Sequence, residues 1–144
     1  PAFKTALELG ADGIELDVRL TREGKLVVFH DRCLDRTSNG KGPVNHWTQD
    51  QVRSLDAGSW FSPEFQGERP PTLDEVFEFL PADFLINVEM KVIMKGMRLI
   101  AHQVAEVIRP RLMKSKVAAL TTSLIPRSSV INMPNNNSLF SNSA

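Results

Sequence analysis

The stretch Ile14-Glu-Leu-Asp-Val18 alternates apolar and acidic residues, which is the period of a β-strand with one apolar and one polar face. Outward from it, Leu26-Val-Val-Phe-His30 is rich in β-branched residues and predicts a second strand. The intervening Thr21-Arg-Glu-Gly24 is too short to hold a crossover helix. The two strands should therefore form an antiparallel hairpin.

Six further elements are predicted from capping boxes, apolar periodicity and terminating glycines or prolines. They are a helix over residues 1–9, a helix opened by Thr48 with Gln51, a helix opened by Thr72 with Glu75, a strand over 84–90, a helix over 95–108 and a strand over 117–122.

The chain of 144 residues is long enough for one domain with a sizeable core. Lys and Arg together number 17, as do Asp and Glu, so no global charge favours nucleic acid or an anionic membrane as a partner. The apolar runs are too short for a transmembrane segment. The single cysteine, Cys33, excludes an internal disulfide framework and is compatible with a reducing compartment such as the cytoplasm.

Charge and composition change along the chain. Residues 1–106 hold all 17 acidic residues and 12 of the 17 basic ones, whereas residues 107–144 hold the other five basic residues and no acidic one. Ser, Thr and Asn fill 13 of the last 24 positions, a composition that can bury little. We therefore expect an ordered domain over residues 1–120 and a low-complexity, disordered tail over residues 121–144.

Two of the predicted strands carry polar side chains at i, i+2 spacing, which places both on one face. Glu15 and Asp17 form the first pair, and Glu89 and Lys91 form the second. If the hairpin turn is centred between residues 22 and 23, Glu15 lies opposite His30 on that face. A shift of one residue in the register would break this arrangement.

Carboxylates on one face repel each other and are costly to desolvate, so a positive charge should offset them. Oxygen ligands suit a hard divalent cation such as Mg²⁺ or Ca²⁺, which would polarise a phosphoryl oxygen. His30 can exchange a proton near neutral pH, and Lys91 can hold a bound anion. These side chains indicate metal-assisted phosphoryl chemistry.

The same residues also have simpler interpretations, which the sequence leaves open. Glu15 and Asp17 could line a solvent-facing strand edge, and Glu89 with Lys91 could form an exposed ion pair. His30 could be an ordinary surface residue. The aromatic residues at positions 60, 61 and 65 could pack a loop or line a substrate cleft.

Five motifs follow one another along residues 1–120. They are Leu9-Gly-Ala-Asp-Gly-Ile-Glu-Leu-Asp-Val18, Val27-Val-Phe-His-Asp31, Leu34-Asp-Arg-Thr-Ser-Asn-Gly40, Pro71-Thr-Leu-Asp-Glu75 and Asn87-Val-Glu-Met-Lys91. In this order they resemble the glycerophosphodiester phosphodiesterase family.

The resemblance implies an α/β fold that is part of a TIM-type (β/α)₈ barrel, with an insertion at about residues 36–80 over the barrel mouth. It implies metal-dependent hydrolysis of small glycerophosphodiesters to an alcohol and sn-glycerol 3-phosphate, in glycerophospholipid metabolism. By this resemblance the metal ligands are Glu15, Asp17 and Glu89, one of two catalytic histidines is His30, and the residue near the phosphate is Lys91.

The family's His-Arg-Gly and Glu-Asn-Thr segments, which carry the second histidine, an arginine and a further metal ligand, have no counterpart in the sequence. A TIM barrel takes about 250 residues, so we expect a fragment with an incomplete barrel and no activity alone. Two alternatives remain. One is a lysophospholipase D-type enzyme of the same barrel family acting on lysophospholipids, and the other is a truncated, non-catalytic relative acting as a binding or interaction module.

Overall fold

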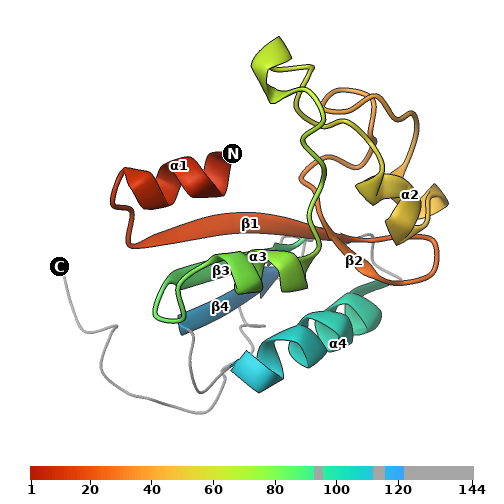
Figure 1. Ribbon diagram of the computed structural model, residues 1–144. Coiled ribbons are helices and arrows are strands. Elements are labelled where there is room, and N and C mark those ends of the chain that lie inside the picture. The colour runs from red at the N-terminus through yellow and green to blue at the C-terminus, as the bar shows by residue number, and fades with distance from the viewer. Residues whose placement is uncertain (93–95, 112–115, 122–144) are drawn as a thin grey trace, which may run out of the picture.

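The computed structural model describes residues 1–92 and 96–111, and the backbone of residues 116–121. Four strands form one sheet in the order β2-β1-β3-β4 (Figure 1). The sheet pairs β1 with β2 antiparallel, and β1 with β3 and β3 with β4 parallel. The strands are β1 (Gly13–Leu20), β2 (Leu26–Val28), β3 (Leu85–Met90) and β4 (Lys116–Thr121). Within the described residues the fold is therefore a partial α/β arrangement with an open sheet.

The predicted helices are present, and both capping boxes are formed. Thr48 opens α2 and Thr72 opens α3, each with its side chain accepting a hydrogen bond from the backbone N–H three residues on. Residues 93–95 and 122–144 lie outside the described residues, so the first position of the predicted helix over 95–108 and nearly all of the predicted tail are not covered. The α-helices are α1 (Ala2–Glu8), α2 (Gln49–Arg53), α3 (Leu73–Phe79) and α4 (Met97–Ile108).

Three helices cover one face of the sheet. Side chains of α1, α3 and α4 share one hydrophobic cluster with alternate residues of β1 and β3. Leu16 and Val18 supply the buried positions of β1, and Ile86, Val88 and Met90 supply those of β3. Because neighbouring strand residues point to opposite faces, the intervening polar residues of both strands lie on the face away from these helices.

The helix α4 owes its position to one apolar stripe. Ile100, Val104 and Ile108 are spaced by about one helical turn and are all buried in the cluster. Figure 1 shows α4 running along the lower side of the sheet, opposite the loop-rich part of the molecule. None of the described helices combines the length and the apolar character needed to cross a membrane.

The hairpin register differs from the prediction by one residue. Val18 pairs with Val28 and Leu20 with Leu26, so the turn is centred on Glu23 and not between residues 22 and 23. Gly24 has a φ of 79°, a left-handed conformation that glycine adopts without strain and that adds one residue to the turn. The expected pairing of Glu15 with His30 across the hairpin is therefore wrong.

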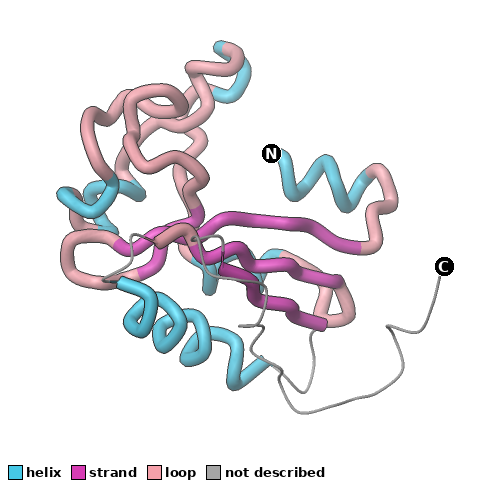
Figure 2. The backbone as a smooth tube through the Cα atoms, turned by 180° about the vertical axis from the view of Figure 1, so that it is seen from behind, coloured by secondary structure: helices cyan, strands magenta, loops and turns pink. Residues whose placement is uncertain are grey.

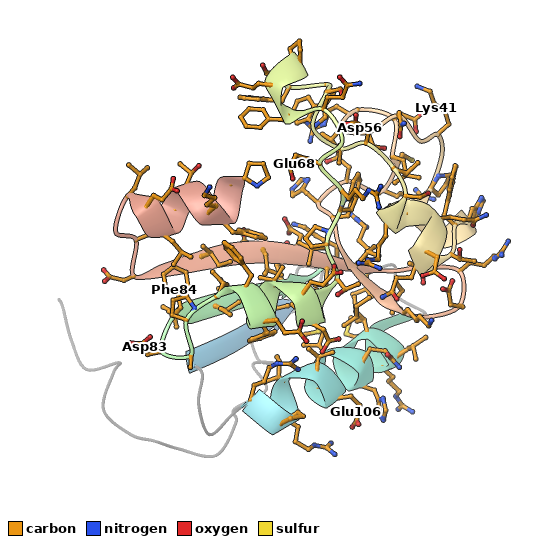
Figure 3. All side chains as sticks on the ribbon, in the orientation of Figure 1. Lys41, Asp56, Glu68, Asp83, Phe84 and Glu106 are labelled. Carbon is orange, nitrogen blue, oxygen red and sulfur yellow. The ribbon has the colours of Figure 1, made fainter. Side chains whose placement is uncertain are left out.

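Between β2 and α3 the chain forms a separate loop-rich body with its own small core. Figure 2 shows this part as mostly loop, and Figure 3 places Lys41 and Asp56 in it, far from Glu106 on α4. Its core consists of Val27, Phe29, Leu34, Val44, Val52 and Leu55. In contrast, α3 packs into the main cluster. The predicted insertion over about residues 36–80 thus includes a helix that belongs to the core beneath the sheet.

One aspartate organises the tip of this loop-rich body. Asp56 accepts hydrogen bonds from the backbone N–H groups of Gly58, Ser59 and Gly67, and from the Ser59 hydroxyl. These bonds hold the pKa of the Asp56 carboxyl well below its usual range, the Ser59 hydroxyl having the largest effect. The loop presents Trp60 to solvent with half of its surface exposed, beside the more exposed Phe61.

Candidate functional site

The polar face of the sheet gathers three carboxylates. Glu15 and Asp17 come from β1, and Glu89 comes from β3, where it is the parallel register partner of Asp17. One carboxylate oxygen from each lies within 4.8 Å of the others. The i, i+2 spacing on one strand and the register between two strands therefore bring the three predicted ligands together.

Lys91 lies directly beside this cluster. Its ammonium forms ion pairs with Glu89 and with Asp17, whose Oδ1 is 3.1 Å from Lys91 Nζ. The backbone N–H of Lys91 donates to Val18 at 3.0 Å, which continues the β1–β3 pairing past the end of β3. The hydrogen bond to Glu89, followed by the contact with Asp17, raises the pKa of Lys91, so its charge is retained. The simpler interpretation of Glu89 and Lys91 as a solvent-exposed ion pair is excluded, because only a fifth of the Lys91 side chain is exposed.

The carboxylates are suited to a hard cation. Asp17 Oδ1 is buried and has no hydrogen bond of good geometry among the described residues, although the Lys91 ammonium lies near it. Asn87, the register partner of Glu15, also has a buried oxygen without such a bond. Oxygen atoms of this kind, close together and short of donors, are the ligands that Mg²⁺ and Ca²⁺ take in proteins. The residues present therefore fit a divalent cation.

His30 lies beyond the end of β2, on the loop that follows it. The last link between the two strands is the backbone N–H of Phe29, which donates to the Asp17 carbonyl at 2.9 Å. The imidazole Nδ1 is 2.7 Å from Asp31 Oδ1, and the ring is two-thirds exposed. A protonated His30 would still favour the ionised form of Glu15. The histidine thus neighbours the carboxylates by way of the loop and not by strand pairing.

Asp31 fixes the tautomer of His30. Arg36 donates two hydrogen bonds to Asp31, at 2.7 and 3.0 Å, and with the His30 contact these keep the pKa of Asp31 well below its usual range. An ionised carboxylate is only an acceptor. Nδ1 of His30 must therefore carry the hydrogen, which leaves Nε2 as the nitrogen that can exchange a proton.

Arg19 binds the backbone carbonyl of the same histidine. Its Nε and Nη2 both donate to the His30 carbonyl, at 2.9 and 2.6 Å. Sequence reasoning missed Arg19, although its i+2 spacing from Asp17 placed it on the polar face. It also missed the Asp31–Arg36 pair, for which a loop spacing of five residues gives no periodic signal.

The aromatic residues at positions 60, 61 and 65 do not join either core. Trp60 and Phe61 meet edge to face with ring centroids 5.7 Å apart, and Phe61 lies 5.8 Å from Phe65. The guanidinium of Arg36 lies 5.8 Å from the centre of the Trp60 ring. Burial of this loop against the core is therefore the wrong interpretation for Trp60 and Phe61.

Comparison with known proteins identifies the family of the chain. The glycerophosphoryl diester phosphodiesterase family matches residues 1–124. The chain belongs to this family. A glycerophosphodiester phosphodiesterase of Caldanaerobacter subterraneus subsp. tengcongensis is 58% identical over 91 residues, which are 62% of this chain and 37% of that protein. Glycerophosphodiester phosphodiesterase 1 of Mus musculus is 40% identical over 93 residues, 62% of this chain and 28% of that protein.

Solved structures of the family share the fold. Glycerophosphodiester phosphodiesterase from Agrobacterium tumefaciens aligns with a TM-score of 0.73 and 38% identity, over 85% of this chain and 50% of that one. A phosphodiesterase from Oleispira antarctica, solved with the product sn-glycerol-3-phosphate, aligns with a TM-score of 0.75 and 28% identity, over 83% of this chain and 49% of that one. The chain thus spans about half the length of these structures.

The electrostatics of the cluster predict how cation binding changes with pH. Burial is the largest cause, and the charges of Asp17 and Glu89 add to it, so the pKa of Glu15 lies above its ordinary 4.5. A protonated carboxyl does not bind a cation, so affinity should begin to fall, as the pH is lowered, at values above 4.5. Calorimetric titration with Mg²⁺ or Ca²⁺ at several pH values measures this. Glu15→Gln should remove the part of the pH dependence that comes from Glu15. A cation affinity that stays unchanged as the pH is lowered to 4.5 would contradict the prediction.

Proposed function

We propose that the protein is a metal-dependent phosphodiesterase, which hydrolyses glycerophosphodiesters to an alcohol and sn-glycerol 3-phosphate in glycerophospholipid metabolism. The observation that supports it best is the convergence of Glu15, Asp17 and Glu89 beside Lys91 and His30 in a chain of this family. The product bound in the Oleispira antarctica relative fits the same reaction. We further propose that the open sheet is part of a (β/α)₈ barrel whose mouth is covered by the loop-rich body.

The roles of the side chains follow from their positions. Glu15, Asp17 and Glu89 would hold a divalent cation, which when bound polarises the phosphoryl oxygens. Lys91 brings a fixed positive charge to the phosphodiester from the edge of the cluster. In the net reaction one water is consumed, as its hydroxyl joins phosphorus and its proton ends on the departing alcohol.

His30 is proposed as an acid–base residue in that proton transfer. Because Nδ1 is held by Asp31, the proton is exchanged at Nε2. Arg19 and Arg36 touch no reacting group in this scheme. They act as positioning residues, one through the His30 carbonyl and the other through Asp31.

Product analysis tests the proposal. The protein carrying this chain is incubated with glycerophosphocholine and, separately, with lysophosphatidylcholine, each with Mg²⁺ or Ca²⁺ and then with a chelator. We expect sn-glycerol 3-phosphate from the first substrate and its loss on chelation. Release of choline from lysophosphatidylcholine alone would favour the lysophospholipase D-type alternative, and no product from either would favour a non-catalytic binding module.

A further inference from the structure

A second polar feature lies next to the carboxylate cluster, at the end of β1 where the chain turns toward β2. It is a cavity of about 370 Å³. Three cationic side chains line it, Arg19, Arg32 and Lys91, together with the apolar side chains of Leu20, Val44 and Val92. Lys91 belongs to both the cavity and the cluster, so the two spaces adjoin. No acidic side chain among the described residues lines the cavity.

Backbone hydrogen bonds fix the walls of the cavity. The N–H of Val44 donates to the carbonyl of Arg32 at 3.0 Å, and the N–H of Arg22 donates to the carbonyl of Trp47 at 2.9 Å. The first bond joins the two loop segments that supply Arg32 and Val44. The second ties the β1–β2 turn to the same loop-rich body. Arg19 is anchored in turn by its two bonds to the His30 carbonyl.

The positive charges of the cavity are not equally compensated. The charge of Lys91 is matched by Asp17 and Glu89. Arg19 makes its hydrogen bonds to a neutral carbonyl and forms no ion pair within the part of the chain that the structure describes. Burial lowers the pKa of Arg19, and the nearby charges of Asp17 and Asp31 oppose this effect. Arg32 is exposed and has no ion pair with any described residue. Two guanidinium groups therefore face one small space without a direct anionic partner.

We propose that this cavity binds the alcohol half of the diester and selects for an anionic group on it, such as a carboxylate or a second phosphate. The inference rests on the proposed function, because it takes the scissile phosphate to lie at the carboxylate cluster. There the phosphate would contact the cation and the ammonium of Lys91. The glycerol half is uncharged, so the two guanidiniums match a further negative charge that only the alcohol half can carry.

The size and the apolar wall fit a small alcohol. Ligand pockets run from about 300 to 1,000 Å³, and this one lies near the lower limit. Leu20, Val44 and Val92 can pack against two or three aliphatic carbons, while a guanidinium fork binds a carboxylate with two parallel hydrogen bonds. A cationic alcohol such as choline would meet like charges, so glycerophosphocholine should be hydrolysed more slowly than a diester with an anionic alcohol, but should still be a substrate.

The test uses two substrates that differ by one carboxylate, glycerophosphoserine and glycerophosphoethanolamine. We expect kcat/KM to favour the serine diester at least about tenfold, the effect of one charge-assisted hydrogen bond. Arg32→Gln should bring that ratio to within about twofold of one, and Arg32→Lys should keep part of it. Arg22→Gln, a change at an exposed arginine in the turn outside the cavity, should keep the full ratio.

A second readout separates this inference from the proposed function. The affinities for both diesters are measured by calorimetry in the His30→Ala protein, where turnover does not interfere. The phosphodiesterase function would be refuted, and the cavity assignment would stand, if glycerophosphoserine bound more tightly but the unmodified protein hydrolysed neither diester. Equal affinities for the two diesters would overturn the inference. So would an equal loss for both in Arg32→Gln, because the cavity would then hold the phosphate that the diesters share.

Discussion

Asp17→Asn is expected to abolish divalent-cation binding, lowering the affinity by more than about 100-fold, since removal even of an outer partner of a metal ligand costs 10–100-fold. Asp17 is the central carboxylate, because it shares its strand with Glu15 and its register position with Glu89. Asparagine keeps the shape and one oxygen but removes the charge. Calorimetric titration with Mg²⁺ or Ca²⁺ measures the change, and sn-glycerol 3-phosphate release should fall with it.

The matched control is Asp12→Asn, which removes an exposed carboxylate just before β1 and outside the cluster. It should bind the cation as the unmodified protein does. Asp17→Asn should also retain its fold, because it removes a charge that Glu15 and Glu89 repel and leaves Glu89 as an ion-pair partner of Lys91. Circular dichroism checks this. Unchanged cation affinity in a folded Asp17→Asn protein would show that the cluster is not the metal site.

His30→Ala is expected to lower turnover by about 10²- to 10⁴-fold, the usual contribution of a general acid or base. Cation binding should stay within a few-fold of the original value, because His30 is not among the three side chains whose ligand atoms lie within 4.8 Å of one another. The combination distinguishes a residue that moves protons from one that binds the cation. It requires turnover and calorimetry on the same preparation.

The control for this change is His46→Ala, which removes an exposed histidine of the loop-rich body. Turnover should be unaffected. Equal turnover by His30→Ala and the unmodified protein would remove His30 from the reaction. A parallel loss of cation affinity would instead assign it to the metal site.

The alternation of polar and apolar residues in β1 and β3 was sufficient to predict the strands and the shared face of the carboxylates. Strand periodicity is a local property, and the i, i+2 rule holds wherever the strand is regular. Local periodicity could not predict that Asp17 and Glu89 are neighbours, because this depends on two segments distant in the sequence pairing in one register. The sequence placed them together only by way of the family resemblance.

The hairpin shows where local reasoning failed. Counting residues between two strands assumes a turn type, and the left-handed Gly24 changed the loop by one residue. His30 nevertheless lies close enough to Glu15 for its charge to influence the Glu15 pKa, although β2 ends before it and it belongs to the loop that follows. The hydrogen bonds of Asp31, Arg36 and Arg19 that orient it depend on this irregular loop geometry, which no periodic pattern encodes.

Binding of the proposed cation by the three carboxylates across β1 and β3 would also couple folding to the ionic composition of the surroundings. Like charges on neighbouring strands weaken the sheet at its centre, and a bound cation would reverse that penalty. By mass action, a ligand that binds only the folded state stabilises it by RT ln(1 + [L]/Kd). The fraction of folded protein would then rise with the free concentration of the cation.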